Sequence, residues 1–287
     1  MATAHQIGRC ILVSVGRSKL IAPIWAALIM VGAAHADAPM RVVSMNLCTD
    51  QLAMLLAAPN QLISVSDIAS DPRMSPMAEQ AADYPVNHGQ AEEIFLLSPD
   101  LVLAGVYSDP VVISMLRRLG VRVEQIGLVN ALDQVPTRIE EVGALLEQEA
   151  AAQTIIAQYE TDLANIIPPQ TGPRAEFYYP NGYALGTGTL SNDILTTAGF
   201  RHIAAEMGRG NSGRLALELM VLADPDLMIH AELYPAASRS EEIMTHPALK
   251  ALPAAVTSSN SDWICGTPAV IAALSRLVEL RLELEGS

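Results

Sequence analysis

One segment of this 287-residue chain is repeated in its second half. Residues 92–103, EEIFLLSPDLVL, recur as residues 218–229, ELMVLADPDLMI, with five identities and five further apolar matches. Each copy is typical of a short helix that opens on a glutamate, ends at Pro-Asp and leads into an apolar strand buried on both faces of a parallel sheet. The repeat predicts an α/β fold with two similar lobes, mainly parallel sheets and a ligand cleft between the lobes.

Residues 1–36 have the pattern of a secretory signal peptide. Three basic residues precede an apolar run over residues 20–34, and Ala34-His35-Ala36 fits the small-x-small cleavage pattern. The run is short for a membrane span, although an uncleaved anchor is the alternative. We expect a mature chain that begins near Asp37, does not span a membrane and, with no cysteine at the cleavage point, carries no lipid.

Without this segment the chain is strongly acidic. The full sequence has 17 basic and 31 acidic residues, and segment 1–36 contains three basic and no acidic ones, so 14 basic and 31 acidic residues remain, a net charge of −17. Such a surface repels nucleic acid and anionic lipid. We therefore expect no nucleic-acid partner.

Two of the three cysteines, Cys48 and Cys265, lie in the expected mature chain, one in each half. In an exported protein they can pair, and the bond would then join the lobes near the cleft and restrict its opening. The alternative is two separate buried thiols, because bridging requires Cα atoms within about 7 Å. The sequence leaves both alternatives open.

The rest of the chain alternates predicted strands and helices. We divide it into an N-terminal lobe over residues 37–132, a bridging helix over 133–167 and a C-terminal lobe over 168–287. The bridging segment keeps apolar residues at helical spacing, so one long helix is predicted, bent near residues 148–150 and ended by Pro168-Pro169. One helix between the lobes would limit closure on a ligand. A short strand is predicted at Trp263-Ile264.

The order of these elements resembles the periplasmic substrate-binding proteins of iron-chelate and cobalamin ABC importers, over essentially the whole mature chain. The matching motifs are residues 41–44, 98–102, 186–189, 224–228 and 265–268. The resemblance implies a monomeric periplasmic protein that captures a metal chelate, a ferric siderophore or cobalamin, and delivers it to an ABC permease dimer. It implies no enzymatic activity and no resident cofactor.

The resemblance also implies that one glutamate of each lobe docks on arginines of the permease. By position these glutamates are Glu92 and Glu218. An acidic residue in the first turn of a helix is also favoured by the helix dipole alone, by about 0.3–1 kcal/mol, so a purely structural role is the alternative. Recurrence at the same place in both lobes favours a two-point, charge-complementary dock.

Ligand contacts are expected from loops at the carboxyl ends of the strands. The residues that we single out there are polar or aromatic, namely Ser44, Asn46, His88, Tyr107, Tyr183, Asn211, Tyr234 and Trp263. The aromatic side chains could flank a flat macrocycle, and core packing is the alternative for each. Arg73, Arg209 and Arg214 could neutralise an anionic chelate, and the alternative for each is a solvated charge on a loop.

The class of ligand stays open at this point. Cobalamin binders that resemble this chain often carry tryptophan after the first Pro-Asp strand, where this chain has Gly105, Val106 and Tyr107, and this difference weakens the corrinoid assignment. Haem is an alternative ligand, and it would need an axial ligand such as Tyr107, His88 or His230.

Other functional classes are less favoured. Four histidines follow the cleavage site, with no histidine-rich loop that would suit a bare metal ion. The sequence contains neither a Gly-x-Ser-x-Gly elbow, nor a phosphate-binding loop, nor a His-Glu-x-x-His motif. A two-lobed metal chelatase is the remaining enzyme alternative, and export argues against it.

Overall fold

The repeated segment leads into a parallel sheet in each lobe. The computed structural model describes residues 38–166, 172–232 and 238–286. Residues 38–287 form one unit. The expected signal segment 1–36, Pro168-Pro169 and Tyr234 lie outside the described residues.

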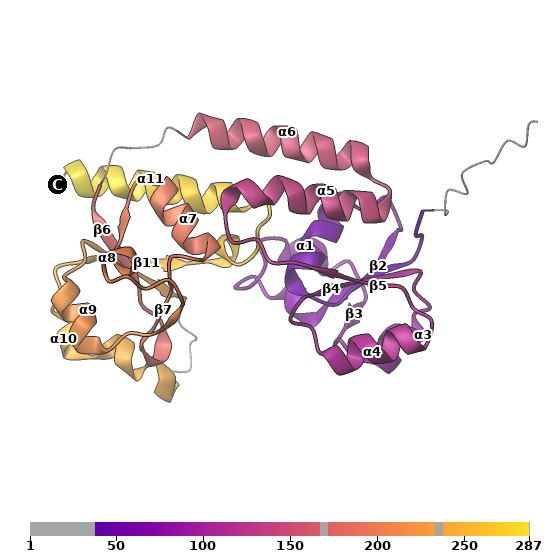
Figure 1. Ribbon diagram of the computed structural model, residues 1–287, viewed down its shortest axis with the longest axis horizontal. Coiled ribbons are helices and arrows are strands. Elements are labelled where there is room, and N and C mark those ends of the chain that lie inside the picture. The colour runs from indigo at the N-terminus through magenta and orange to yellow at the C-terminus, as the bar shows by residue number, and fades with distance from the viewer. Residues whose placement is uncertain (1–37, 167–171, 233–237, 287) are drawn as a thin grey trace, which may run out of the picture. The chain divides into compact units, whose positions relative to one another are not determined.

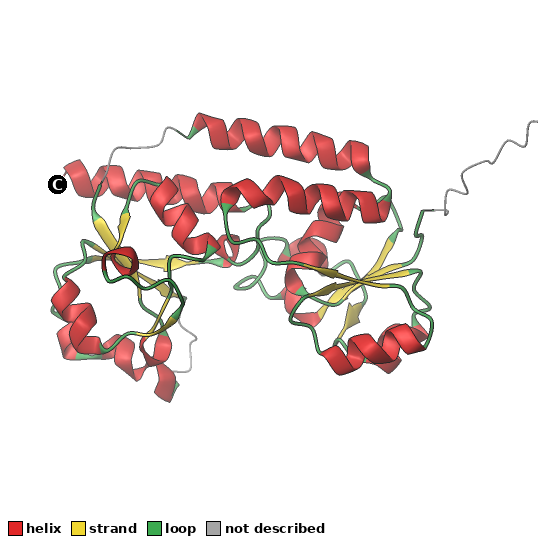
Figure 2. Ribbon diagram, viewed as in Figure 1, coloured by secondary structure: helices red, strands yellow, loops and turns green. Residues whose placement is uncertain are grey.

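The first sheet has five parallel strands in the order β3-β2-β1-β4-β5. Its strands are β1 (Val42–Ser44), β2 (Leu62–Ser66), β3 (Val86–Asn87), β4 (Leu101–Gly105) and β5 (Val123–Ile126), and its helices are α1 (Leu47–Leu56), the 3-10 turn η1 (Asp67–Ser70), α2 (Ala78–Ala81), α3 (Ala91–Leu96) and α4 (Pro110–Arg118). Val42 and Leu101 pack with α1 on one face, whereas Val43 and Val102 pack with α3 and α4 on the other. Helices therefore cover both faces (Figure 2), as the apolar pattern predicts.

The second sheet has four parallel strands in the order β11-β10-β6-β8, beside a separate antiparallel pair, β7 and β9. The strands are β6 (Arg174–Phe177), β7 (Tyr183–Ala184), β8 (Arg201–His202), β9 (Gly213–Arg214), β10 (Leu227–Ala231) and β11 (Ala255–Ser259). The helices are η3 (Pro180–Gly182), α7 (Leu190–Thr197), α8 (Ile203–Glu206), α9 (Leu217–Ala223), η4 (Arg239–Thr245), α10 (Pro247–Lys250), η5 (Ser261–Trp263) and α11 (Val270–Gly286). Strands β6, β8, β10 and β11 take the places that β1, β2, β4 and β5 take in the first sheet. The prediction of two similar lobes with mainly parallel sheets is confirmed.

An arginine–aspartate clasp closes both copies of the repeat. The Asp100 carboxylate accepts the backbone N–H of Arg41 at 3.0 Å, and the Arg41 guanidinium donates to carbonyls just after α3. In the second lobe Asp226 accepts the N–H of Arg174 at 2.6 Å, and Arg174 donates to carbonyls at the end of α9. The Pro-Asp motif therefore ties the end of each repeated helix to the start of β1 or β6.

The segment between the lobes is a helical hairpin, which corrects the prediction of one long helix. After the 3-10 turn η2 (Leu132–Gln134), helix α5 (Val135–Leu146) ends at Glu147, whose φ of 55° is left-handed, and α6 (Glu149–Asn165) packs along α5 (Figure 1). Gly143 permits the close approach, because a β-carbon there would lie 2.5 Å from that of Ala152. The sequence indicates a bend near this point, but no glycine or proline at 147 or 148 marks the reversal.

Trp263 and Ile264 do not form the predicted strand. The last strand, β11, ends at Ser259, and Trp263 closes the turn η5. The indole is 7% exposed and packs edge-on against Phe177, with 5.9 Å between the ring centroids. A short apolar pair after polar residues does not distinguish a strand from a buried turn.

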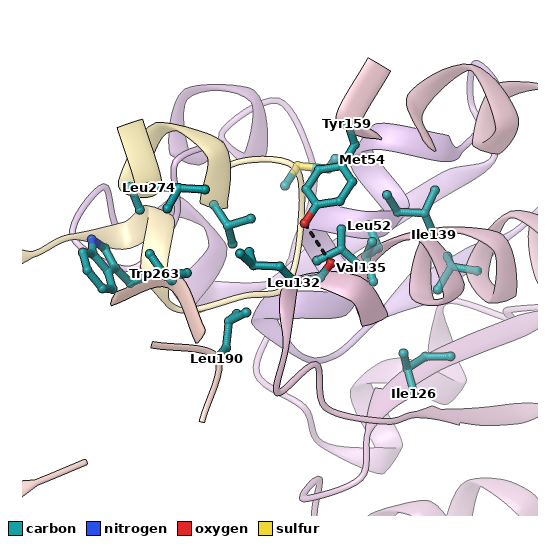
Figure 3. Close-up of a cluster of buried hydrophobic side chains, with 14 of the residues drawn as sticks. Leu52, Met54, Ile126, Leu132, Val135, Ile139, Tyr159, Leu190, Trp263 and Leu274 are labelled. Carbon is teal, nitrogen blue, oxygen red and sulfur yellow. Dashed lines mark hydrogen bonds between the residues drawn. The ribbon is translucent and has the colours of Figure 1, made fainter. Parts of the chain in front are cut away.

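One hydrophobic cluster runs through both lobes (Figure 3). It includes Leu52 and Leu132 of the first lobe, Tyr159 of α6 and Trp263 of the second lobe. The Tyr159 hydroxyl donates to the Leu132 carbonyl at 2.8 Å, and the Leu132 N–H donates to Asp193 at 2.7 Å. The lobes therefore share a core. No helix within the described ranges is both long enough and apolar enough to cross a bilayer.

Candidate ligand-binding site

Two recesses lie between the lobes, and Ile264 lines both. The N-terminal recess, of about 100 Å³, is lined by residues that follow β1, β4 and β5, together with Ile264 and Gly266. The C-terminal recess, of about 390 Å³, is lined by residues at the ends of β6, β10 and β11, together with Arg73 and Met74. Both recesses are therefore built at the carboxyl ends of parallel strands, which is the edge where α/β sheets bind ligands.

Asn46 and Tyr107 shape the N-terminal recess. The Asn46 side chain begins helix α1 by accepting the backbone N–H of Cys48 at 3.1 Å. Gly105 leaves room for it, because a β-carbon there would lie 3.0 Å from the Asn46 amide. Tyr107 lines the same recess and is 83% exposed. The recess therefore presents a fixed amide and an accessible phenol ring.

Tyr179 and Trp263 supply the aromatic wall of the C-terminal recess. The Tyr179 hydroxyl forms a 3.2 Å hydrogen bond with that of Ser259, and burial raises the pKa of Tyr179 to about 12. The phenol therefore stays neutral near pH 7. Glu232 lines the same recess.

Both arginines at the recesses are paired with carboxylates. Arg73 bonds Asp71 at 2.8 Å, and its guanidinium hydrogen bonds hold the pKa of Asp71 below the usual range. Arg138 bonds Glu141 from helix α5. The positive charge of each of these arginines is therefore balanced by a carboxylate of the same chain. Two further arginines, Arg209 and Arg214, were predicted to neutralise an anionic chelate, but neither is among the described residues that line the recesses. Arg209 donates to the Gly213 carbonyl and Arg214 to the Asn181 carbonyl, both within the second lobe.

Three contacts join the lobes beside the N-terminal recess. A disulfide links Cys48 to Cys265, with 5.2 Å between the Cα atoms. The Thr267 hydroxyl donates to the Gln51 side chain at 3.2 Å, in a buried position. Gly266 lies against the side chain of Val129. Of the two cysteine states that the sequence left open, the structure has the paired one.

A buried carboxylate lies behind this junction, on helix α1. Asp50 accepts the backbone N–H of Ser66 at 3.1 Å and also the Ser66 hydroxyl. Its side chain is fully buried, and burial raises its pKa to about 6 despite these hydrogen bonds. Asp50 therefore titrates nearer to neutral pH than an exposed aspartate.

The structure brings three of the predicted ligand residues to the recesses. Asn46 and Tyr107 line the N-terminal recess, and Trp263 lines the C-terminal recess. Ser44, Tyr183 and Asn211 are not among the described residues that line either one. Ser44 is buried and shares a 2.7 Å hydrogen bond with Thr49, Tyr183 belongs to β7, and Asn211 lies over Gly186.

The histidines predicted as haem ligands are not among the described residues that line the two recesses. His88 forms a 3.1 Å bond with Glu93, and His230 lines a separate recess of about 290 Å³ within the second lobe. In the part of the chain that the structure describes, no three His, Cys, Asp or Glu side chains group so as to hold a metal ion. Tyr107 is thus the predicted axial ligand that the structure brings to the cleft.

Sequence reasoning missed several lining residues. Arg138 lies on the helix predicted only as a bridge, and Met74 and Ser191 carry no motif. Tyr179 lies just after β6, which ends at Phe177, so the rule that ligands bind at carboxyl ends of strands could have singled it out.

Glu92 and Glu218 are both exposed and lie in the first turns of α3 and α9. Each helix covers the sheet face opposite the one that carries the shared core. This geometry fits both a docking role and a helix-dipole role.

Most of the chain matches one known protein family. The family model described as "Periplasmic binding protein" matches residues 42–258, from the first strand to the last. The chain belongs to the periplasmic binding protein family. A "Cobalamin-binding protein" of Halobacterium salinarum is 29% identical over 202 residues, which is 67% of this chain and 53% of the relative. The chain therefore spans about half the length of the curated relative that it matches.

Solved structures of other periplasmic binding proteins share the fold. The haem-binding protein HutB of Vibrio cholerae has a TM-score of 0.70 at 19% identity, covering 84% of this chain and 98% of that one. The vitamin B12 binding protein BtuF of Vibrio cholerae has a TM-score of 0.67 at 18% identity, covering 87% of this chain and 99% of that one.

Proposed function

We propose that this periplasmic binding protein captures a metal chelate, a corrinoid such as cobalamin, in the cleft between its lobes and delivers it to an ABC permease. The observation that carries the proposal is the pair of adjoining recesses at the carboxyl ends of both sheets. Pockets for small molecules measure about 300–1,000 Å³, so the N-terminal recess, of about 100 Å³, is too small alone and a macrocycle would extend over both.

The charge of the cleft supports a corrinoid over a highly anionic chelate. Arg73 and Arg138 are already paired with Asp71 and Glu141, and Glu232 adds a carboxylate. Without residues 1–36 the chain has 14 basic and 31 acidic residues, a net charge of −17. A ferric catecholate would bring several negative charges to this environment, whereas cyanocobalamin is neutral. The named function of the halobacterial relative supports the same class of ligand.

Tyr107 favours haem as a second candidate ligand. Its phenol is 83% exposed at the N-terminal recess, and a tyrosine oxygen can ligate haem iron. The haem-binding protein with the same fold supports this alternative.

Delivery to the permease is proposed to use Glu92 and Glu218. Two exposed carboxylates, one on each lobe, suit a partner with two equivalent basic sites. The protein itself performs no reaction and acts as a monomer in the periplasm. Purified protein should therefore bind a chelate at one to one and should not insert metal into a porphyrin or corrin, as a chelatase would.

The test is a titration of the mature protein, residues 37–287, with cyanocobalamin, haemin and a ferric tricatecholate. Trp263, the one tryptophan in this segment, reports by fluorescence, and calorimetry checks the stoichiometry. Tyr107→Ala should weaken ligand binding about tenfold, whereas Tyr183→Ala, an exposed tyrosine outside both recesses, should not.

Saturable one-to-one binding of cyanocobalamin at micromolar affinity or better supports the corrinoid assignment. Tighter binding of haemin, with an absorption shift that Tyr107→Phe abolishes, supports haem instead. If none of the three ligands binds, the proposal of chelate capture is wrong.

A further inference from the structure

Leu96 and Leu222 are large apolar side chains exposed to nearly the same extent, 80% and 79%. They occupy equivalent positions of the repeated segment, and each lies one helical turn after the proposed docking glutamate of its lobe. Because residues four apart lie on one face of a helix, Glu92 and Leu96 share a face of α3, and Glu218 and Leu222 share a face of α9.

The matched exposure is part of a wider correspondence between the two copies. Ile94 and Met220, also equivalent, are both fully buried beneath their helices. Single exposed leucines are common on protein surfaces and need no explanation. Here, however, both lobes bury the same position of the repeat and expose the same position beside a carboxylate.

The clasps tie the end of each of these helices to the start of β1 or β6. The turn after each helix passes through a left-handed residue, Ser98 with φ of 48° and Asp224 with φ of 44°, which are again equivalent. Arg41 and Arg174 then bind the carbonyls around these turns. Each lobe therefore presents a carboxylate and a leucine in the same local geometry.

We propose that Leu96 and Leu222 are apolar contacts of the docking surface, each entering an apolar recess beside the basic residue that receives the neighbouring glutamate. This inference rests on the proposed function. The partner that fits is a permease with two equivalent subunits, because the same pair of groups, one charged and one apolar, recurs once on each lobe. The glutamates would orient the protein on the permease and speed its association. The leucines, once buried in the complex, would slow its dissociation.

The test measures binding of fluorescently labelled mature protein to right-side-out membrane vesicles of the source organism at several salt concentrations. Leu96→Gln and Leu222→Gln should each weaken binding about tenfold, and the double variant about a hundredfold, because distant sites act additively. The control is Leu282→Gln, which changes a leucine that is 59% exposed on α11, outside the repeat, and should bind like the wild type.

Salt dependence separates the two kinds of contact. Glu92→Gln with Glu218→Gln should flatten the salt dependence of binding, whereas the leucine variants should weaken binding and keep that dependence, since apolar contacts are not screened. The inference is overturned if the double leucine variant binds vesicles like the wild type while the glutamate variants bind more weakly. If the wild type neither binds vesicles saturably nor binds any of the three chelates, the proposed function fails as well.

Discussion

Gly266 of the second lobe lies so close to Val129 of the first that a β-carbon on the glycine would stand 2.2 Å from that of Val129. Real β-carbons do not approach so closely, so Gly266→Ala must push the lobes apart at the N-terminal recess. We expect a loss of about 1–3 kcal/mol in the free energy of unfolding and weaker ligand binding.

Urea denaturation and ligand titration measure these two effects. Gly213→Ala is the matched control, because a β-carbon there would meet no atom within 4 Å. Wild-type stability and affinity in Gly266→Ala would contradict the close contact.

The Cys48–Cys265 bond should stabilise the protein by constraining the unfolded chain. The two cysteines are 217 residues apart, and closing so long a loop contributes up to about 5 kcal/mol by reducing the entropy of the unfolded chain. The Cys48→Ala/Cys265→Ala variant should therefore melt well below the wild type. A thiol assay under denaturing, non-reducing conditions should find no free thiol in the mature chain, residues 37–287, and two per chain would refute the bond.

Asp50 should make the protein less stable as pH rises from about 4 to 6. Its pKa is about 6 in the folded state, against 3.8 for an exposed aspartate, so within this interval the folded state keeps a proton that the unfolded state has lost. The ionised, buried carboxylate then costs about 3 kcal/mol above pH 6.

Asp50→Asn removes this dependence. The free energy of unfolding of the variant, relative to that of the wild type, should increase as pH rises from 4 to 7. If the pKa of Asp50 is that of an exposed aspartate, this difference should not change with pH. Comparing the two proteins at each pH cancels the contributions of other carboxylates such as Asp71 and Glu206, whose lowered pKa values act in the opposite direction.

Tyr159→Phe should destabilise the junction between α6 and the first lobe. It removes the donor to the buried Leu132 carbonyl and keeps the ring, so the expected loss is about 1–2 kcal/mol, because a buried acceptor stays unpaired. Tyr183→Phe, at an exposed position, should change stability by less than about 0.5 kcal/mol. Equal melting temperatures for the two variants would contradict a structural role for this bond.

The repeat was sufficient to predict most of the fold, because a buried strand after Pro-Asp is a local pattern. The hydrogen bonds that fix the Pro-Asp motif in the fold could not be predicted. In the second lobe they join Arg174 to Asp226, and these residues are 52 positions apart in the sequence. The reversal at Glu147 was missed because an uncharacteristic residue takes the left-handed conformation there. Packing of α6 on α5 decides that turn, and packing is a tertiary property.

The candidate site was harder to predict than the fold. Asn46 and Tyr107 follow strands directly, so their place at the recess follows from strand direction. Arg138 reaches the same recess from α5, which no pattern in the sequence connects with the cleft. His88 follows a strand as well, but it turns to Glu93 on the adjacent helix.

The position of the disulfide in the chain has a consequence for biosynthesis. Cys48 belongs to the first helix, and Cys265 stands just before the last. The bond therefore cannot close until the chain has been made through residue 265, after every strand of both sheets, and it secures the folded lobes without guiding the early steps. Any product truncated before residue 265 lacks the partner of Cys48, so the oxidised bond marks chains that extend past residue 265.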